Sequence, residues 1–147
     1  MGGHEWFYFV PYQSDINIAL QGLRRREFEA GRYNPVMWFP PFPVEANSPA
    51  PGAQHTSIEE AMEAADADGT RSILDMERIS DTPDFGAVVP FPDEELIDLF
   101  GTDKPTREMI EGNDDLFERL ERGQGVYVIA YQDDAPTEIY FAGYSYD

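Results

Sequence analysis

The clearest pattern of apolar and polar positions lies near the start of the chain. Residues 6–10, WFYFV, are apolar at every position, which is typical of a strand that is covered on both faces. Ser14 then stands where a helix N-cap is expected, and apolar residues recur at helical spacing over 16–23 before Gly31. This part of the sequence predicts a covered strand followed by one long amphipathic helix that ends at the glycine.

Shorter segments of the same two kinds fill the rest of the chain. The helical ones have a capping residue before them or a glycine after them, and the strand-like ones are short apolar runs. The final two runs are separated by the turn 132–136, which predicts a hairpin. The expected helices begin near Ser57, Asp93, Thr106 and Asn113, and the expected strands cover 72–79, 85–89, 126–131 and 137–144.

Strands at both ends with helices between them predict an α+β fold. We expect a mainly antiparallel sheet of four or five strands with three or four helices. The N-terminal strand 6–10 and the hairpin strand 126–131 are both apolar on two faces, so we place them at the centre of the sheet. A length of 147 residues, with no internal repeat, predicts one globular domain over 1–147.

A proline-rich loop is expected at about residues 35–55. Its prolines remove amide donors and fix φ, which disfavours both helix and central strand. Its first half also contains Trp38 and other large apolar side chains, so we expect this loop to be partly packed against the domain.

The acidic residues are distributed unevenly along the chain. The net charge is −19, yet residues 1–35 are neutral, so residues 36–147 carry all of it. Such a surface repels nucleic-acid phosphates and anionic lipid, and it favours a basic protein partner. No window approaches the roughly 18 apolar residues of a membrane span. The chain also lacks cysteine, which fits a reducing cytoplasm, so we expect a soluble cytoplasmic protein that binds neither nucleic acid nor membrane.

Glu27 is the residue that breaks the apolar stripe of the first helix. A carboxylate in that stripe must be paired or must shift its pKa upward, because an unpaired buried charge is costly. Arg26, Arg32, Tyr33 or a tyrosine of the final hairpin could pair with it. One interpretation is a structural ion pair or a side chain that leans into solvent. The other is a ligand-binding pocket between the first helix and the proline-rich loop, lined by Glu27, Arg32, Tyr33 and Trp38.

Other chemistry has little support in the sequence. The two histidines have no second histidine at ligand spacing, and residues 66–77 lack the glycine that a calcium loop requires at its sixth position. No phosphate-binding or dinucleotide-binding motif is present. We therefore assign no catalytic residue, no metal site and no cofactor.

Two functional hypotheses follow. The first is a small acidic binding protein, regulatory or toxin-neutralising, that engages a basic protein partner and is not an enzyme. The alternative is a small enzyme or ligand-binding domain with its pocket near the end of the first helix and the proline and aromatic loop.

Overall fold

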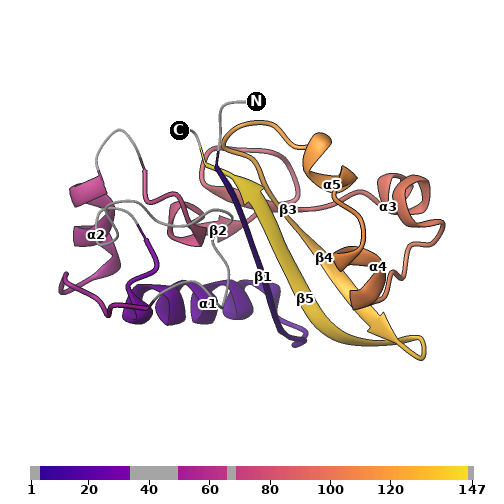
Figure 1. Ribbon diagram of the computed structural model, residues 1–147, viewed down its shortest axis with the longest axis horizontal. Coiled ribbons are helices and arrows are strands. Elements are labelled where there is room, and N and C mark those ends of the chain that lie inside the picture. The colour runs from indigo at the N-terminus through magenta and orange to yellow at the C-terminus, as the bar shows by residue number, and fades with distance from the viewer. Residues whose placement is uncertain (1–3, 34–49, 66–68, 146–147) are drawn as a thin grey trace.

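The computed structural model describes residues 4–33, 50–65 and 69–145, and within them the fold is α+β, as predicted. A five-stranded sheet lies between two groups of helices (Figure 1). The strands are β1 (Glu5–Pro11), β2 (Arg78–Ile79), β3 (Ala87–Pro90), β4 (Gly125–Gln132) and β5 (Ala135–Tyr144). The helices are α1 (Ile16–Ala30), α2 (Ile58–Ala65), the 3₁₀ turn η2 (Ile73–Asp75), α3 (Asp93–Phe100), α4 (Arg107–Glu111) and α5 (Asp115–Glu118).

The sheet is mixed, so the expectation of a mainly antiparallel sheet is wrong. Its strand order is β1-β5-β4-β3-β2, with antiparallel pairs at β1·β5 and β5·β4 and parallel pairs at β4·β3 and β3·β2. The physical reason is the connection between β3 and β4. It runs through α3, α4 and α5 and returns the chain to the end of the sheet where β3 began, so β4 runs parallel to β3.

β4 occupies the middle of the sheet, as predicted, but β1 is an edge strand and its predicted central position is wrong. The apolar character of β1 on both sides has another cause. Trp6, Tyr8 and Val10 point into the core beneath α1, whereas Phe7 and Phe9 pack against the core beneath α4 and α5. A strand covered on two faces can therefore still lie at the edge of a sheet.

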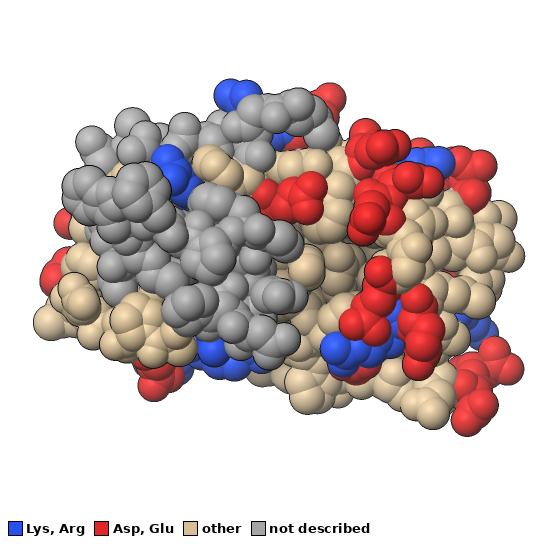
Figure 2. Space-filling model, in the orientation of Figure 1, with Lys and Arg blue, Asp and Glu red and all other residues tan. Residues whose placement is uncertain are grey.

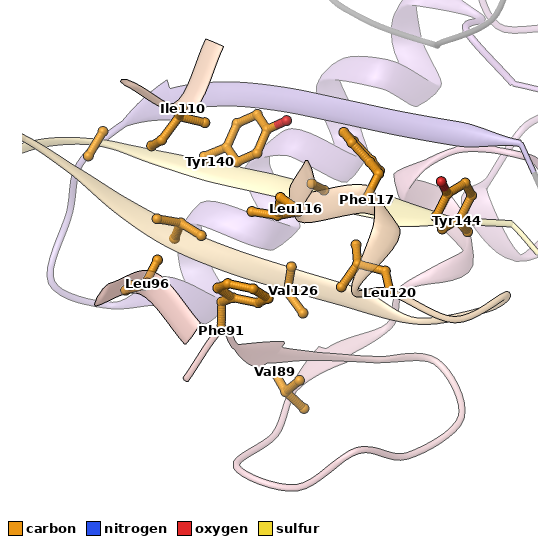
Figure 3. Packing of buried hydrophobic residues seen from close by; sticks show 13 residues of the cluster. Val89, Phe91, Leu96, Ile110, Leu116, Phe117, Leu120, Val126, Tyr140 and Tyr144 are labelled. Carbon is orange, nitrogen blue, oxygen red and sulfur yellow. The ribbon is translucent and has the colours of Figure 1, made fainter. Parts of the chain in front are cut away.

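The two groups of helices cover opposite faces of the sheet (Figure 1). On one face, α1 and η2 enclose a core that contains Trp6, Leu20 and Ile73. On the other face, α3, α4 and α5 close a separate core against β3, β4 and β5 (Figure 3). Its members include Phe91, Leu96, Ile110, Leu116, Phe117, Leu120, Val126, Tyr140 and Tyr144.

Trp6 lies in a slot made by two glycines on the neighbouring strands. The register places Trp6 opposite Gly143 on β5, and Gly143 opposite Gly125 on β4. A Cβ on Gly143 would lie 2.5 Å from the indole, and a Cβ on Gly125 would lie 3.1 Å from it. The large ring thus fills the space that two side chains leave empty, which fixes the pairing of the three strands at this end.

The sequence near each end of α1 predicted the bounds of that helix well, but it predicted the region before β3 less well. Gly31 ends α1 in the left-handed conformation, as predicted, but the N-cap is Asp15, whose carboxylate accepts from the Ile18 amide at 3.1 Å, and not Ser14. The strand expected over 72–79 is wrong. Ser72 accepts from the Leu74 amide at 3.2 Å and starts η2, which leaves only the two-residue β2.

Two loops also differ from expectation. The hairpin turn is shorter than 132–136, because only Asp133 and Asp134 separate β4 from β5, both at positive φ. Most of the proline-rich loop, with Trp38, lies outside the described residues. Its end packs against α1, since the Gly52 amide donates to the Ala30 carbonyl at 2.8 Å.

Candidate functional site

Glu27 is fully buried and paired. Its position in the apolar stripe of α1 points the carboxylate into the structure, where Oε2 accepts from Arg32 Nη1 at 2.7 Å and from Arg26 Nε at 3.0 Å. Two of the predicted partners therefore supply the pairing. Oε1 is buried and has no hydrogen-bond partner among the described residues. Burial raises the pKa of the nearby Tyr8 hydroxyl well above its ordinary value, and the negative charge of Glu27 raises it further.

Tyr33 does not join this ion cluster. Its hydroxyl lies 2.7 Å from His55 Nδ1, and its ring stacks on Phe28. The hydrogen bond ties the segment before α2 to the end of α1. Of the four residues predicted to line one pocket, the structure brings Glu27 and Arg32 together, places Tyr33 in a separate contact and leaves Trp38 outside the described residues.

The three consecutive arginines of α1, Arg24, Arg25 and Arg26, do not gather around one anion. Arg24 is buried and donates to the Leu74 carbonyl at 3.0 Å and to Gln21 Oε1 at 3.0 Å. Burial lowers its pKa. Arg25 points to solvent, and Arg26 is held by Glu27. Arg24 therefore fastens α1 to η2, and the three arginines do not form an anion site.

The layer formed by α3, α4 and α5 is strongly acidic. Residues 93–121 contain eleven acidic side chains and three basic ones. Two of the basic ones are engaged within the molecule: Arg107 pairs with Glu111 and Glu138, and Arg119 pairs with Glu95 and Asp98. The remaining carboxylates are exposed and form no ion pair with the described residues: Asp93, Glu94, Asp103, Glu108, Asp114, Asp115, Glu118 and Glu121.

In Figure 2, acidic side chains are prominent over the part of the molecule that α3, α4 and α5 occupy in Figure 1. Two apolar side chains, Ile97 on α3 and Met109 on α4, are also exposed in this layer. We call residues 93–121 with these features the acidic layer. It offers negative charge together with some apolar surface, which suits contact with a basic protein.

Two adjoining hollows open beside the acidic layer. The larger, of about 460 Å³, lies between the loop before β3 and the turn before β4, and the smaller, of about 240 Å³, continues toward the start of α3. They share Pro83, Val89, Arg119 and Gln124, so they form one groove. Glu27, Arg32 and Tyr33 line neither hollow.

Sequence reasoning did not predict this groove. Its walls come from two segments that are about 35 residues apart in the chain, and only β3·β4 pairing brings them together. The one local signal is Phe85, an exposed aromatic residue that stands between Asp84 and Gly86. If the β3·β4 pairing is not known, an exposed phenylalanine in a loop does not by itself indicate a binding site.

Comparison with known proteins identifies no relative: no protein-family model, curated protein or solved structure matches the chain. Within the described ranges, no helix has the length and apolar character needed to cross a membrane. The same residues contain no group of three or more side chains placed to hold a metal ion. The surface and its charges are therefore the basis for a functional assignment.

Proposed function

We propose that this protein binds a basic protein partner through the acidic layer of α3, α4 and α5. The observation that carries the proposal is the set of exposed carboxylates in residues 93–121 that form no ion pair with the described residues. Like charges at such density repel one another and oppose folding. A basic partner would relieve that repulsion and would associate faster because of the attraction.

The charges in this layer differ in what they do for the fold. Asp93, Glu94 and Glu95 lie in the first turn of α3, where the helix dipole favours carboxylates. Glu108 and Glu118 also lie in first turns, but α4 and α5 are only five and four residues long, so their dipoles are small. The two carboxylates are exposed and form no hydrogen bond or ion pair with the described residues. We therefore expect a partner to depend on Glu108 and Glu118, because the fold gains little from their charge.

The test uses two sets of charge-neutralising substitutions. The surface set is Glu94→Gln, Glu108→Gln and Glu118→Gln in the acidic layer. The matched control set is Glu29→Gln, Glu59→Gln and Glu63→Gln, which are also exposed but lie on α1 and α2. Both sets change the net charge by the same amount, so they separate a local surface from the overall charge.

The proteins are used as bait in native lysate at low and high salt, and the captured proteins are identified. We expect a protein of basic isoelectric point to be retained by the unchanged chain and by the control set. It should be lost from the surface set and at about 0.5–1 M salt, where the screening length falls toward about 3 Å. Equal capture by both sets, or no capture at low salt, would reject the proposal.

A ligand-binding role at the end of α1 is the second candidate. It is favoured by Glu27 Oε1, which is buried and has no hydrogen-bond partner among the described residues. A small primary amine could donate to this atom. If the role is correct, at least one of a panel of small amines should raise the melting temperature of the unchanged protein but not that of Glu27→Gln. A panel with no such compound would exclude this class of ligand.

A further inference from the structure

The groove beside the acidic layer has a lining of polar and apolar residues, with two valines of the neighbouring core at its floor. Val89 on β3 and Val126 on β4 are buried members of the core beneath α3, α4 and α5, and both also line the groove. In Figure 3, Val89 lies at the margin of this core. The groove therefore gives access to the edge of an existing apolar core.

The rim of the groove presents an aromatic side chain on an anchored loop. Phe85 is 71% exposed. Its loop is fastened on both sides, because the Glu77 amide donates to the Gly86 carbonyl at 2.6 Å and Arg78 pairs with Asp84 at 2.5 Å. Arg78 also donates to the Phe85 carbonyl at 3.2 Å. These contacts fix the backbone of the loop, so a partner that binds there needs to order little additional backbone.

The walls of the groove carry more negative than positive charge. The acidic residues are Asp81, Asp84, Glu95 and Glu121, and the basic ones are Arg119 and Arg122. Arg119 pairs with Glu95 and Asp98, and Asp84 pairs with Arg78, so part of the charge of both signs is compensated within the molecule. The wall residues that form no ion pair with the described residues are Asp81, Glu121 and Arg122. An occupant that combines an apolar side chain with flanking positive charge matches both the floor and the walls.

We propose that this groove receives an aromatic side chain flanked by arginine or lysine from the basic partner. The inference rests on the proposed function and adds the anchor point: the acidic layer supplies the long-range attraction, and the groove between residues 81–92 and 119–126 supplies the apolar contact. Buried aromatic side chains with surrounding polar contacts commonly dominate the energy of protein interfaces. A second copy of this chain does not fit, because each copy carries a net charge of −19.

The experiment uses two fluorescein-labelled heptapeptide amides as probes. One has a central tryptophan flanked by arginines, and the other has serine in place of the tryptophan. Their affinities for the full chain are measured by anisotropy at low salt, and amide shifts of the isotope-labelled chain locate the binding. We expect the tryptophan peptide to bind at least about ten-fold more tightly, which corresponds to about 1.4 kcal/mol. Shifts specific to that peptide should fall in 81–92 and 119–126.

Three variants make the test specific. Phe85→Ala and Pro83→Lys, both at exposed positions of the groove, should bring the affinity ratio of the two peptides close to one. Ile18→Ala is the matched control, because Ile18 is a similarly exposed apolar residue on α1, at 58% exposure. It should leave the ratio unchanged. The amide spectrum of each variant shows whether it is folded.

The alternative outcomes separate the two proposals. If both peptides bind equally and the groove shows no specific shifts, the groove inference is wrong while the acidic layer stands as the partner surface. If neither peptide binds at low salt, the proposed function fails, and the groove inference fails with it. If N-acetyltryptophanamide alone binds the groove as tightly as the tryptophan peptide, the groove is a small-molecule site and the inference is overturned.

Discussion

On the face of the sheet covered by α1, charged side chains lie inside the structure, whereas on the face covered by α3, α4 and α5 they lie outside. Beneath α1, the buried Glu27 holds Arg26 and Arg32, and the buried Arg24 donates to a backbone carbonyl. Beneath α3, α4 and α5, the core consists of apolar and tyrosine side chains, and the carboxylates point to solvent.

This difference separates charges that the fold explains from charges that it does not. A buried ion pair is tied to the structure, because removing one partner leaves the other without compensation. Exposed carboxylates contribute little to stability, and their mutual repulsion is unfavourable. The charges beneath α1 are therefore accounted for by internal contacts. Internal contacts do not account for the charges on the acidic layer, whereas a binding partner would, so the proposed function is based on that face.

Removing Glu27 should have the largest effect. Glu27→Ala removes a fully buried carboxylate together with its hydrogen bonds to Arg26 and Arg32, and we expect the free energy of unfolding to fall by about 3–5 kcal/mol. Glu118→Ala, in the acidic layer, should change it by no more than about 0.5 kcal/mol. Urea unfolding of the two variants measures both values.

Glu27→Gln is the control for the shape of the side chain. It keeps the volume and one carbonyl acceptor but removes the charge. The free energy of unfolding should therefore fall less than it does for Glu27→Ala. Equal effects of Glu27→Ala and Glu118→Ala would contradict the contrast between the two faces.

The slot for Trp6 gives the next largest effect. A Cβ on Gly143 would lie 2.4 Å from the Gln124 carbonyl oxygen and 2.5 Å from the indole. Gly143→Ala should therefore destabilise the protein by about 1–3 kcal/mol or more through overpacking. Near-ultraviolet circular dichroism should also show a change in the environment of the tryptophan.

Gly22 provides a matched glycine-to-alanine substitution that should stabilise the protein and not destabilise it. It lies on the outer side of α1, where a Cβ would meet nothing within 4 Å. Gly22→Ala should stabilise the helix by about 0.5–1 kcal/mol, because glycine loses more conformational freedom than alanine on folding. If both substitutions destabilise the chain equally, close packing around Trp6 is not the reason for Gly143.

The sequence predicted what depends on neighbouring residues. Gly31 ends α1 and Thr106 begins α4 where they were expected to, and the side chain of Thr106 accepts from the Met109 amide at 3.2 Å. The sequence also named Arg26 and Arg32 among the possible partners of Glu27, and these two pair with it. These features need only the helical period and the chemistry of helix ends.

What depends on distant residues could not be predicted. Apolar character on both sides of residues 6–10 shows that both faces are covered, but it does not distinguish the edge of a sheet from its centre. The direction of β4 depends on the path of α3, α4 and α5. The groove depends on that same pairing, because neither of its walls is distinctive alone. Leu74 and Met76 alternate as in a strand, but the Ser72 side chain favours a 3₁₀ turn there.

Alkaline pH should affect both faces, since each buries a tyrosine. Burial raises the pKa of Tyr8 beneath α1 and of Tyr140 beneath α4 and α5 well above the value of 10 that they have when unfolded. Unfolding therefore releases protons above pH 10. We expect the free energy of unfolding to fall as pH rises past 10, by up to about 1.4 kcal/mol per pH unit for each tyrosine.

Urea midpoints measured between about pH 8 and pH 11 test this dependence, using the slope expected from linkage. Tyr8→Phe and Tyr140→Phe should each make the curve shallower, and the double variant should flatten it most. A curve that is unchanged in the double variant would show that other groups control the alkaline transition. A larger effect of Tyr8 would fit the additional repulsion that Glu27 exerts on its ionised form.

The smallest effect on stability is expected at the hairpin turn, where the strain lies in the backbone conformation and not in either core. Asp133 and Asp134 have φ values of 53° and 63°, a conformation that side chains other than glycine and asparagine adopt at some cost. Asp134→Gly should therefore stabilise the protein by about 0.5–1 kcal/mol, measured by urea unfolding. Asp134→Ala keeps the strain and should not stabilise. Asp134→Asn removes only the charge next to Asp133, so a gain equal to that of glycine would assign the effect to charge repulsion and not to φ.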